Sequence, residues 1–124
     1  MVDTRIEERR AEAEATARLR DVIQRIQAAA DPMDEIAAFE PALRQSRDGW
    51  RDARRLLIAP FMKEGKLGPA IAALEIVVAV YPGRADERRL LASLFGRTGQ
   101  WDRAIAQADA AAGMSPDAAA LHAA

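Results

Sequence analysis

The feature that most constrains the fold of this chain is an internal repeat of 34 residues. When residues 51–84 are aligned without a gap to residues 85–118, 11 of the 34 positions are identical. A period of this length is typical of a unit of two helices joined by a turn, so two such units are predicted in succession. The identical positions, written with the residues of the first copy, are Asp52, Arg54, Arg55, Leu56, Leu57, Phe61, Gly65, Ala70, Ile71, Ala72 and Pro82.

The residue types at these positions suit pairs of closely packed helices. Gly65 and Gly99 can take the left-handed conformation that ends a helix, and a proline that cannot continue a helix closes each copy. Ala70 and Ala104 let two helices approach closely. Alanine also supplies 29 of the 62 hydrophobic residues, whereas aromatic residues make up only 5% of the chain. The sequence therefore predicts an all-α fold.

The matched positions resemble the tetratricopeptide-repeat family. A large apolar residue is followed four positions later by an aromatic one, as in Leu57 and Phe61, and then by the turn glycine, the alanine and the closing proline. The resemblance covers residues 51–118 and implies an α-solenoid of helix pairs that binds other polypeptides. Residues 95–112 are also similar, over generic repeat positions, to repeats in accessory proteins of bacterial type VI secretion.

Two departures from the family pattern lie in the first helices of the copies, one in both copies and one in the first copy alone. Arg54 and Arg88 stand where the family often has tryptophan. Pro60 interrupts the first helix of the first copy and is expected to kink it, because proline removes the amide that would bond to Leu56.

The first fifty residues show no third copy of the repeat. Residues 1–30 are predicted to form a long, charged N-terminal helix, and residues 31–50 a short connecting helix. Asp31 and Pro32 are a strong helix start, and Pro41 is expected to break or kink the helix that follows. The remaining residues, 51–124, form the repeat region, and a further helix is expected to start in residues 117–124.

An apolar seam lies in the second half of the N-terminal helix. Leu19, Ile23, Ile26 and Ala30 are spaced four, three and four residues apart, as in a narrow contact between helices. One interpretation is that the seam joins two copies of the chain, with the N-terminal helix as an oligomerisation arm. The alternative is that it packs inside the monomer and caps the first repeat.

Composition and motifs argue against catalysis and cofactor binding. The chain has no cysteine and a single histidine, His122, with no carboxylate nearby at ligand spacing, so neither a metal site nor a catalytic triad is expected. Gly65 to Gly68 does not have the pattern of a phosphate-binding loop. The 18 basic residues nearly cancel the 19 acidic ones, which disfavours nucleic-acid and membrane partners. A cytoplasmic, non-enzymatic protein without a cofactor is the expectation.

The two tryptophans are predicted to be structural. Trp101 occupies the aromatic turn position of the family pattern, and Trp50 is expected to pack the junction between the N-terminal helices and the repeats. Neither is expected to stack on a ligand.

The candidate binding residues follow from the family resemblance, which places one face of each repeat's first helix along a concave groove. The positions carried over are Asp52, Arg55, Ala59, Met62 and Lys63, then Asp86, Arg89, Ser93, Gly96 and Arg97. Four cations outnumber two carboxylates there, which suits an acidic peptide or a C-terminal carboxylate. The partner-binding residues predicted on this basis are Arg55, Met62, Lys63, Arg89, Ser93 and Arg97.

Three functions are consistent with these observations. The first is a protein-binding adaptor or assembly module, whose partner is a protein or peptide. The second is the N-terminal helical or oligomerisation region of a larger bacterial enzyme, for example a glycosyl- or sulfotransferase. The third is a structural helical bundle without a ligand groove.

Overall fold

The computed structural model describes residues 4–114, and all the regular structure within that range is helical, as the sequence predicts. Four of the described helices are unbroken over 13 residues or more, and the rest of the helical chain is divided into short pieces. The expected helix in residues 117–124 and His122 lie outside the described residues. In chain order the elements are α1 (Thr4–Ala28), α2 (Pro32–Glu35), η1 (Ile36–Ala38), α3 (Phe39–Arg44), α4 (Gly49–Asp52), η2 (Ala53–Ile58), α5 (Ala59–Lys63), α6 (Leu67–Val80), α7 (Ala85–Arg97) and α8 (Trp101–Met114).

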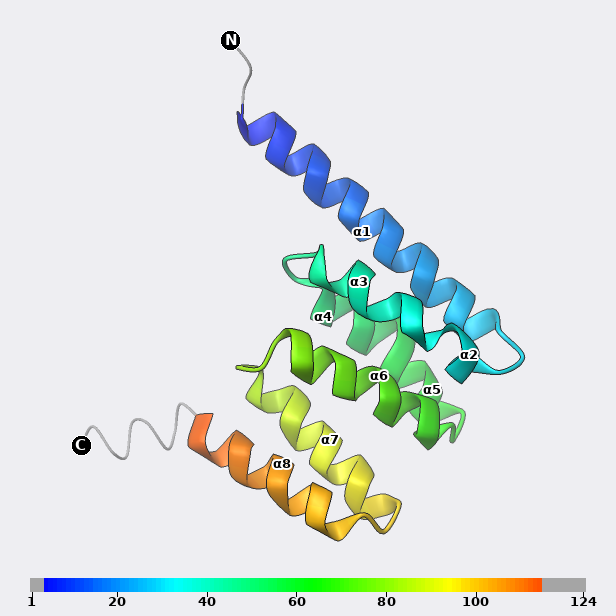
Figure 1. The fold of residues 1–124 in the computed structure, drawn as a ribbon, viewed down its shortest axis with the longest axis vertical. Coiled ribbons are helices and arrows are strands. Elements are labelled where there is room, and N and C mark those ends of the chain that lie inside the picture. Colours follow the sequence, from blue (N-terminus) through cyan, green and yellow to red (C-terminus); the bar gives the residue numbers. More distant parts are fainter. Residues whose placement is uncertain (1–3, 115–124) are drawn as a thin grey trace, which may run out of the picture.

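The elements are arranged as successive helix pairs (Figure 1). We call the pair formed by α4, η2, α5 and α6 hairpin 1, and the pair formed by α7 and α8 hairpin 2. In hairpin 1, η2 and α5 pack against α6, and in hairpin 2, α7 packs against α8. Helix α6 also contacts α3 on one side and α7 on the other, while α1 contacts α3 and η2.

The turn of each hairpin has the same geometry at positions 34 residues apart. Gly65 and Gly99 take φ values of 75° and 77°, the left-handed conformation expected for the turn glycines. Directly after each glycine, a backbone amide bonds back over five residues: Lys66 N donates to Phe61 O and Gln100 N to Phe95 O, both at 2.8 Å. The register found in the sequence therefore corresponds to equivalent backbone positions at the two turns.

The helix that contains Pro60 is irregular, and the irregularity precedes the proline. Residues Ala53–Ile58 form a π-helical stretch, in which the Ala59 amide bonds to the Arg54 carbonyl, five residues back. Because Pro60 has no amide, the carbonyl of Leu56 lacks its usual helical partner, and the side-chain amide of Gln27 donates to it. This bond also fastens α1 to hairpin 1.

The N-terminal seam is part of the core of the monomer. Leu19, Ile23 and Ile26 are buried by the chain's own helices, and Ala30 lies beyond the end of α1 and is exposed. This arrangement is the intramolecular alternative and corrects the assignment of these residues to an oligomerisation surface. A second chain could reach them only if the core opened.

The connecting segment starts where the sequence predicts and bends earlier than expected. The Asp31 side chain accepts a hydrogen bond from the Met33 amide at 3.1 Å, and Pro32 opens α2. The irregular turn is η1, upstream of Pro41. Pro41 itself lies in the first turn of α3, where a missing amide costs no helical hydrogen bond.

A tyrosine joins hairpin 1 to the turn before it. The Tyr81 hydroxyl donates to the Ser46 carbonyl at 2.6 Å and accepts from the Gly49 amide at 3.1 Å. A β-carbon on Gly49 would lie 2.8 Å from side-chain atoms of both Leu19 and Leu43, so a larger residue there would displace these buried leucines.

Candidate interaction surface

Two of the three arginines predicted to line the groove, Arg55 and Arg89, are paired with carboxylates that precede them by three residues. Arg55 Nη2 lies 3.5 Å from Asp52 Oδ1, and Arg89 Nη2 lies 2.7 Å from Asp86 Oδ1. The hydrogen bond from Arg89 holds the pKa of Asp86 below its usual value. Asp52 also accepts two hydrogen bonds from Arg20 of α1, at 3.0 and 3.4 Å. The positive charge of the groove is therefore smaller than a count of its cations suggests.

The six predicted partner-binding residues do not converge on one pocket. Ser93 and Arg97 line a cleft on hairpin 2, whereas Arg89 lines a different hollow together with Asp86 and Met114. On hairpin 1, Lys63 is exposed and Met62 is half-buried against the core.

The cleft on hairpin 2 is mostly apolar and has a volume of about 600 Å³. The large side chains in it are strongly exposed: Trp101 retains 65% of its accessible surface and Ile105 retains 58%. Arg97 is its only charged lining residue. We call this surface the α7–α8 face and define it by its lining residues, Ala92, Ser93, Gly96, Arg97, Trp101, Ala104, Ile105 and Ala108.

Trp101 differs from its sequence-based interpretation. It was expected to pack as a turn aromatic, yet most of its surface is open to solvent. Its ring lies across Gly96, where an added β-carbon would be 3.3 Å from ring atom Cζ3. Because Gly96 has no side chain, the indole can lie against the surface of α7 there. Trp50, in contrast, packs partly buried against the core as expected.

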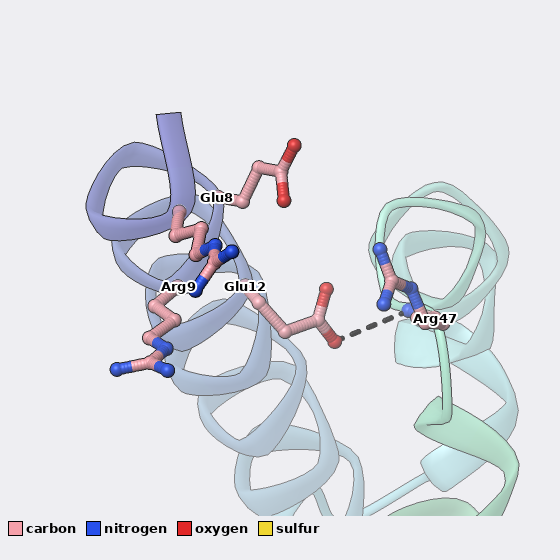
Figure 2. Close-up of a pocket in the computed structure, with 5 residues that line it drawn as sticks. Glu8, Arg9, Glu12 and Arg47 are labelled. Carbon is pink, nitrogen blue, oxygen red and sulfur yellow. Dashed lines mark hydrogen bonds between the residues drawn. The ribbon is translucent and has the colours of Figure 1, made fainter. Parts of the chain in front are cut away.

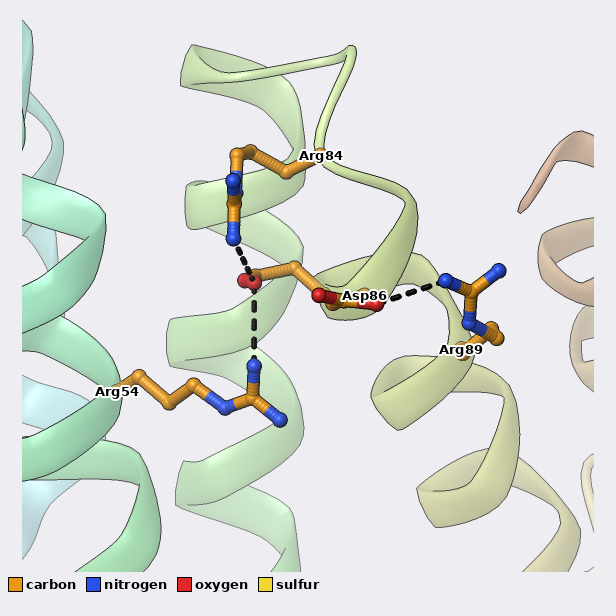
Figure 3. A network of polar contacts seen from close by, with 5 residues as sticks. Arg54, Arg84, Asp86 and Arg89 are labelled. Atoms are coloured by element: carbon orange, nitrogen blue, oxygen red, sulfur yellow. Dashed lines mark hydrogen bonds and ion pairs between the residues drawn. The ribbon is translucent and has the colours of Figure 1, made fainter. Parts of the chain in front are cut away.

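A partly buried ionic cluster connects the two hairpins (Figure 3). Glu87 of α7 is fully buried, and its Oε1 lies 3.3 Å from Arg54 Nη1 of η2 and 3.2 Å from Arg84 Nη2. The Arg84 guanidinium also stacks on Trp50, 3.4 Å from the ring centre. Glu87 matches Ala53 in the repeat, so nothing in the sequence alignment indicated a buried carboxylate at this position.

A hollow near the start of α1 contains charges of both signs. Arg5, Glu8, Arg9, Glu12 and Arg47 line it, and Glu12 Oε1 accepts a hydrogen bond from the Arg47 backbone amide at 3.3 Å (Figure 2). The alternation of charges gives this hollow no single preference for an anion or a cation.

Within residues 4–114, no three histidine, cysteine or carboxylate residues come close enough together to hold a metal ion. No helix in that range has both the length and the apolar composition needed to cross a membrane. The α7–α8 face differs from the other hollows described above because its lining is mostly apolar, and it is the strongest candidate for an interaction surface.

No protein-family model matches the chain, and searches of curated proteins and of solved structures returned no significant match.

Proposed function

We propose that the protein is a non-enzymatic interaction module that binds another polypeptide, and that its hairpins are tetratricopeptide-type repeats. The observation that carries the proposal is the exposure of Trp101 and Ile105 on the apolar α7–α8 face. Contiguous apolar surface with large exposed side chains marks interaction sites in soluble proteins. The repeat assignment is supported by the equal turn geometry at Gly65 and Gly99.

The composition of the face suits a polypeptide better than a small polar ligand. Tryptophan is enriched among the residues that dominate binding energy at protein interfaces, and small neighbours let a partner approach closely. Arg97 and Ser93 supply polar groups beside the apolar surface. This distribution agrees with interfaces that have an apolar centre and a polar rim.

The experiment that tests this function compares variants of the whole chain as baits in an extract of the source cells. Parent, Ile105→Asp and Ile6→Asp are used, since Ile6 is also exposed, at 53%, but lies on α1. We expect a partner that the parent and Ile6→Asp retain and Ile105→Asp loses. The captured protein is then purified and its affinity for all three chains is measured by calorimetry. Equal affinities for parent and Ile105→Asp would contradict the proposal.

A further inference from the structure

The two hairpins bury the same repeat positions to different extents. Ile71 of α6 is 7% exposed, whereas the matched Ile105 of α8 is 58% exposed. Leu74 is buried and its match, Ala108, is exposed. The positions that face the first helix of each pair do not differ in this way, because Ala70 and Ala104 are both buried. Helix α6 therefore has a cover over these positions that α8 lacks, and outside hairpin 1 its neighbours are α7, α3 and α2.

Helix α7 is the element that follows hairpin 1 and packs on α6 (Figure 1). It is joined to η2 by the ion pair between Arg54 and Glu87. Along α7, Glu87 and Leu94 are fully buried and Leu90 is half-buried. Within residues 4–114, no helix follows hairpin 2 in the same way.

We propose that the α7–α8 face binds an amphipathic helix of a separate polypeptide, placed on hairpin 2 as α7 is placed on hairpin 1. This inference rests on the proposed function and names its partner class. The expected helix carries a carboxylate followed by apolar residues three and seven positions later, as Glu87, Leu90 and Leu94 do in α7. The small residues of the face allow the helix backbone to come close.

The repeat register also identifies the cation that would receive the carboxylate. Arg54, the partner of Glu87, matches Arg88. Arg88 is half-buried and donates from Nε to the Pro82 carbonyl at 3.0 Å and from Nη1 to Gln107 at 3.1 Å. A guanidinium has five N–H donors, so these two bonds leave donors for a carboxylate on a docked helix.

The register argues against two alternative occupants of the α7–α8 face, which are residues 115–124 of this chain and the α7 helix of a second copy. Continued into residues 115–124, it places Leu121 at the position of Glu87 and Ala124 at that of Leu90, so this segment does not carry the pattern. The α7 of a second copy does carry it, but Glu87 and Leu94 of that helix are buried in its own core. A helix from a different polypeptide meets neither obstacle.

The test uses the full chain and a helix-stabilised peptide with the sequence of residues 84–99 as the probe. Leu91 and Phe95 are changed to glutamine in the peptide, because the repeat matches them to Leu57 and Phe61 of the shared core within a hairpin. We expect saturable binding to the parent and to Ile6→Asp, and about tenfold weaker binding to Ile105→Asp. Binding that is undetectable at about 1 mM peptide, or equal for parent and Ile105→Asp, would overturn the inference.

A charge exchange tests the proposed register. Arg88→Glu in the protein is expected to weaken binding of the peptide about tenfold, and Glu87→Arg in the peptide is expected to restore it. Circular dichroism of Arg88→Glu, with Arg88→Gln as a milder variant, checks that hairpin 2 remains folded. If both variants bind the original peptide as the parent does, the register is overturned.

Three further outcomes separate this inference from the proposed function. A parent that sediments as a dimer and becomes monomeric on Ile105→Asp would identify a second copy as the occupant. Peptide binding that appears only after removal of residues 115–124 would identify that segment. A captured partner that needs Ile105 but does not compete with the peptide would retain the proposed function. Each of the three would overturn the helix inference.

Discussion

Hairpin 1 and hairpin 2 share a repeat register and a turn geometry, but they differ in what surrounds them. Helix α6 has neighbours on both sides, and its buried side includes Leu74, Val77 and Val78. Helix α8 contacts α7, and alanines occupy the three matched positions. Backbone geometry in this chain thus follows the repeat, whereas the size and burial of side chains follow the position of a hairpin in the stack.

The two hairpins also differ in the charge that they bury at matched positions. Hairpin 1 buries Ala53 against its neighbours, while hairpin 2 buries Glu87 at the matched position and needs Arg54 and Arg84 to compensate it. One oxygen of Glu87 and Nε of Arg84 are buried without a hydrogen-bond partner among the described residues. The junction between the hairpins is therefore less apolar than the core beneath hairpin 1, and unpaired buried groups weaken it.

The largest expected effect on stability is that of charges placed in α1, which packs against α3 and against η2 of hairpin 1. Ile23→Glu with Ile26→Glu places two charges in the apolar core, and a buried unpaired charge costs several kcal/mol. Since domains of this size are stable by roughly 5–15 kcal/mol, we expect the double variant to lose most of its helical circular dichroism signal. Ile6→Glu, on the exposed part of α1, is the control. An oligomeric parent that yields a folded monomer on this double substitution would contradict intramolecular packing.

The most direct test of the comparison removes the same side chain from both hairpins. Ile71→Ala is expected to lower the free energy of unfolding by about 2–4 kcal/mol, because Ile71 is buried. Ile105→Ala is expected to change it by less than about 0.5 kcal/mol, because Ile105 is exposed. Urea unfolding of both variants gives the two values. Equal losses would show that Ile105 is covered in the free protein.

A second matched pair tests the close helix crossing inside each hairpin. Ala70→Leu and Ala104→Leu are each expected to cost about 1–3 kcal/mol, because a larger side chain overpacks the crossing. The cost is expected to be larger for Ala70, which is completely buried, than for Ala104 at 9% exposure. Leucine has nearly the helix propensity of alanine, so an unchanged melting temperature would count against a close crossing.

A smaller effect is expected at the tyrosine that ties hairpin 1 to the preceding turn. Tyr81→Phe removes the partner of the Gly49 amide and the Ser46 carbonyl, at a cost of about 1 kcal/mol. Burial raises the pKa of Tyr81 above its usual value of 10.0. The unfolded chain therefore releases this proton first, and stability falls as the pH rises above about 10 towards the folded-state pKa. Urea unfolding between pH 8 and pH 11, in steps of about one unit, should show a shallower alkaline loss in Tyr81→Phe than in the parent.

Some features of the fold could be predicted from local sequence, and others could not. The all-α class, the cap at Asp31 and the left-handed glycines follow from short-range preferences, and all three are present in the structure. The burial of Glu87 could not be predicted, because it depends on Arg54, 33 residues away. The burial of Ile23 could not be predicted either, because it depends on α3 and η2, which lie far along the chain and supply the surface against which α1 packs.

The candidate site was only partly predictable for the same reason. The family resemblance predicts Ser93 and Arg97, which line the α7–α8 face, but it does not predict Trp101 and Ile105, the largest apolar members of that face. The family pattern predicts that Trp101 packs, because it occupies the aromatic turn position that Leu67 occupies in the first copy. Whether such a position is buried depends on the presence of a following helix, and a repeat alignment contains no information on that.

The smallest expected effect concerns the exposed ion pairs that the two hairpins share. Asp52 has a second partner in Arg20 besides Arg55, whereas the pKa of Asp86 is lowered first by its hydrogen bond with Arg89. Arg89→Gln is therefore expected to raise the pKa of the Asp86 carboxyl towards its ordinary value of 3.8. A carboxyl with a lowered folded-state pKa contributes stability above its unfolded pKa, and this contribution is lost as the pH falls through the folded value. The substitution should remove that contribution without reducing helicity at neutral pH. Carboxyl NMR titration of parent and variant measures the pKa directly, and an unchanged Asp86 titration would show that the Arg89 contact does not persist in solution.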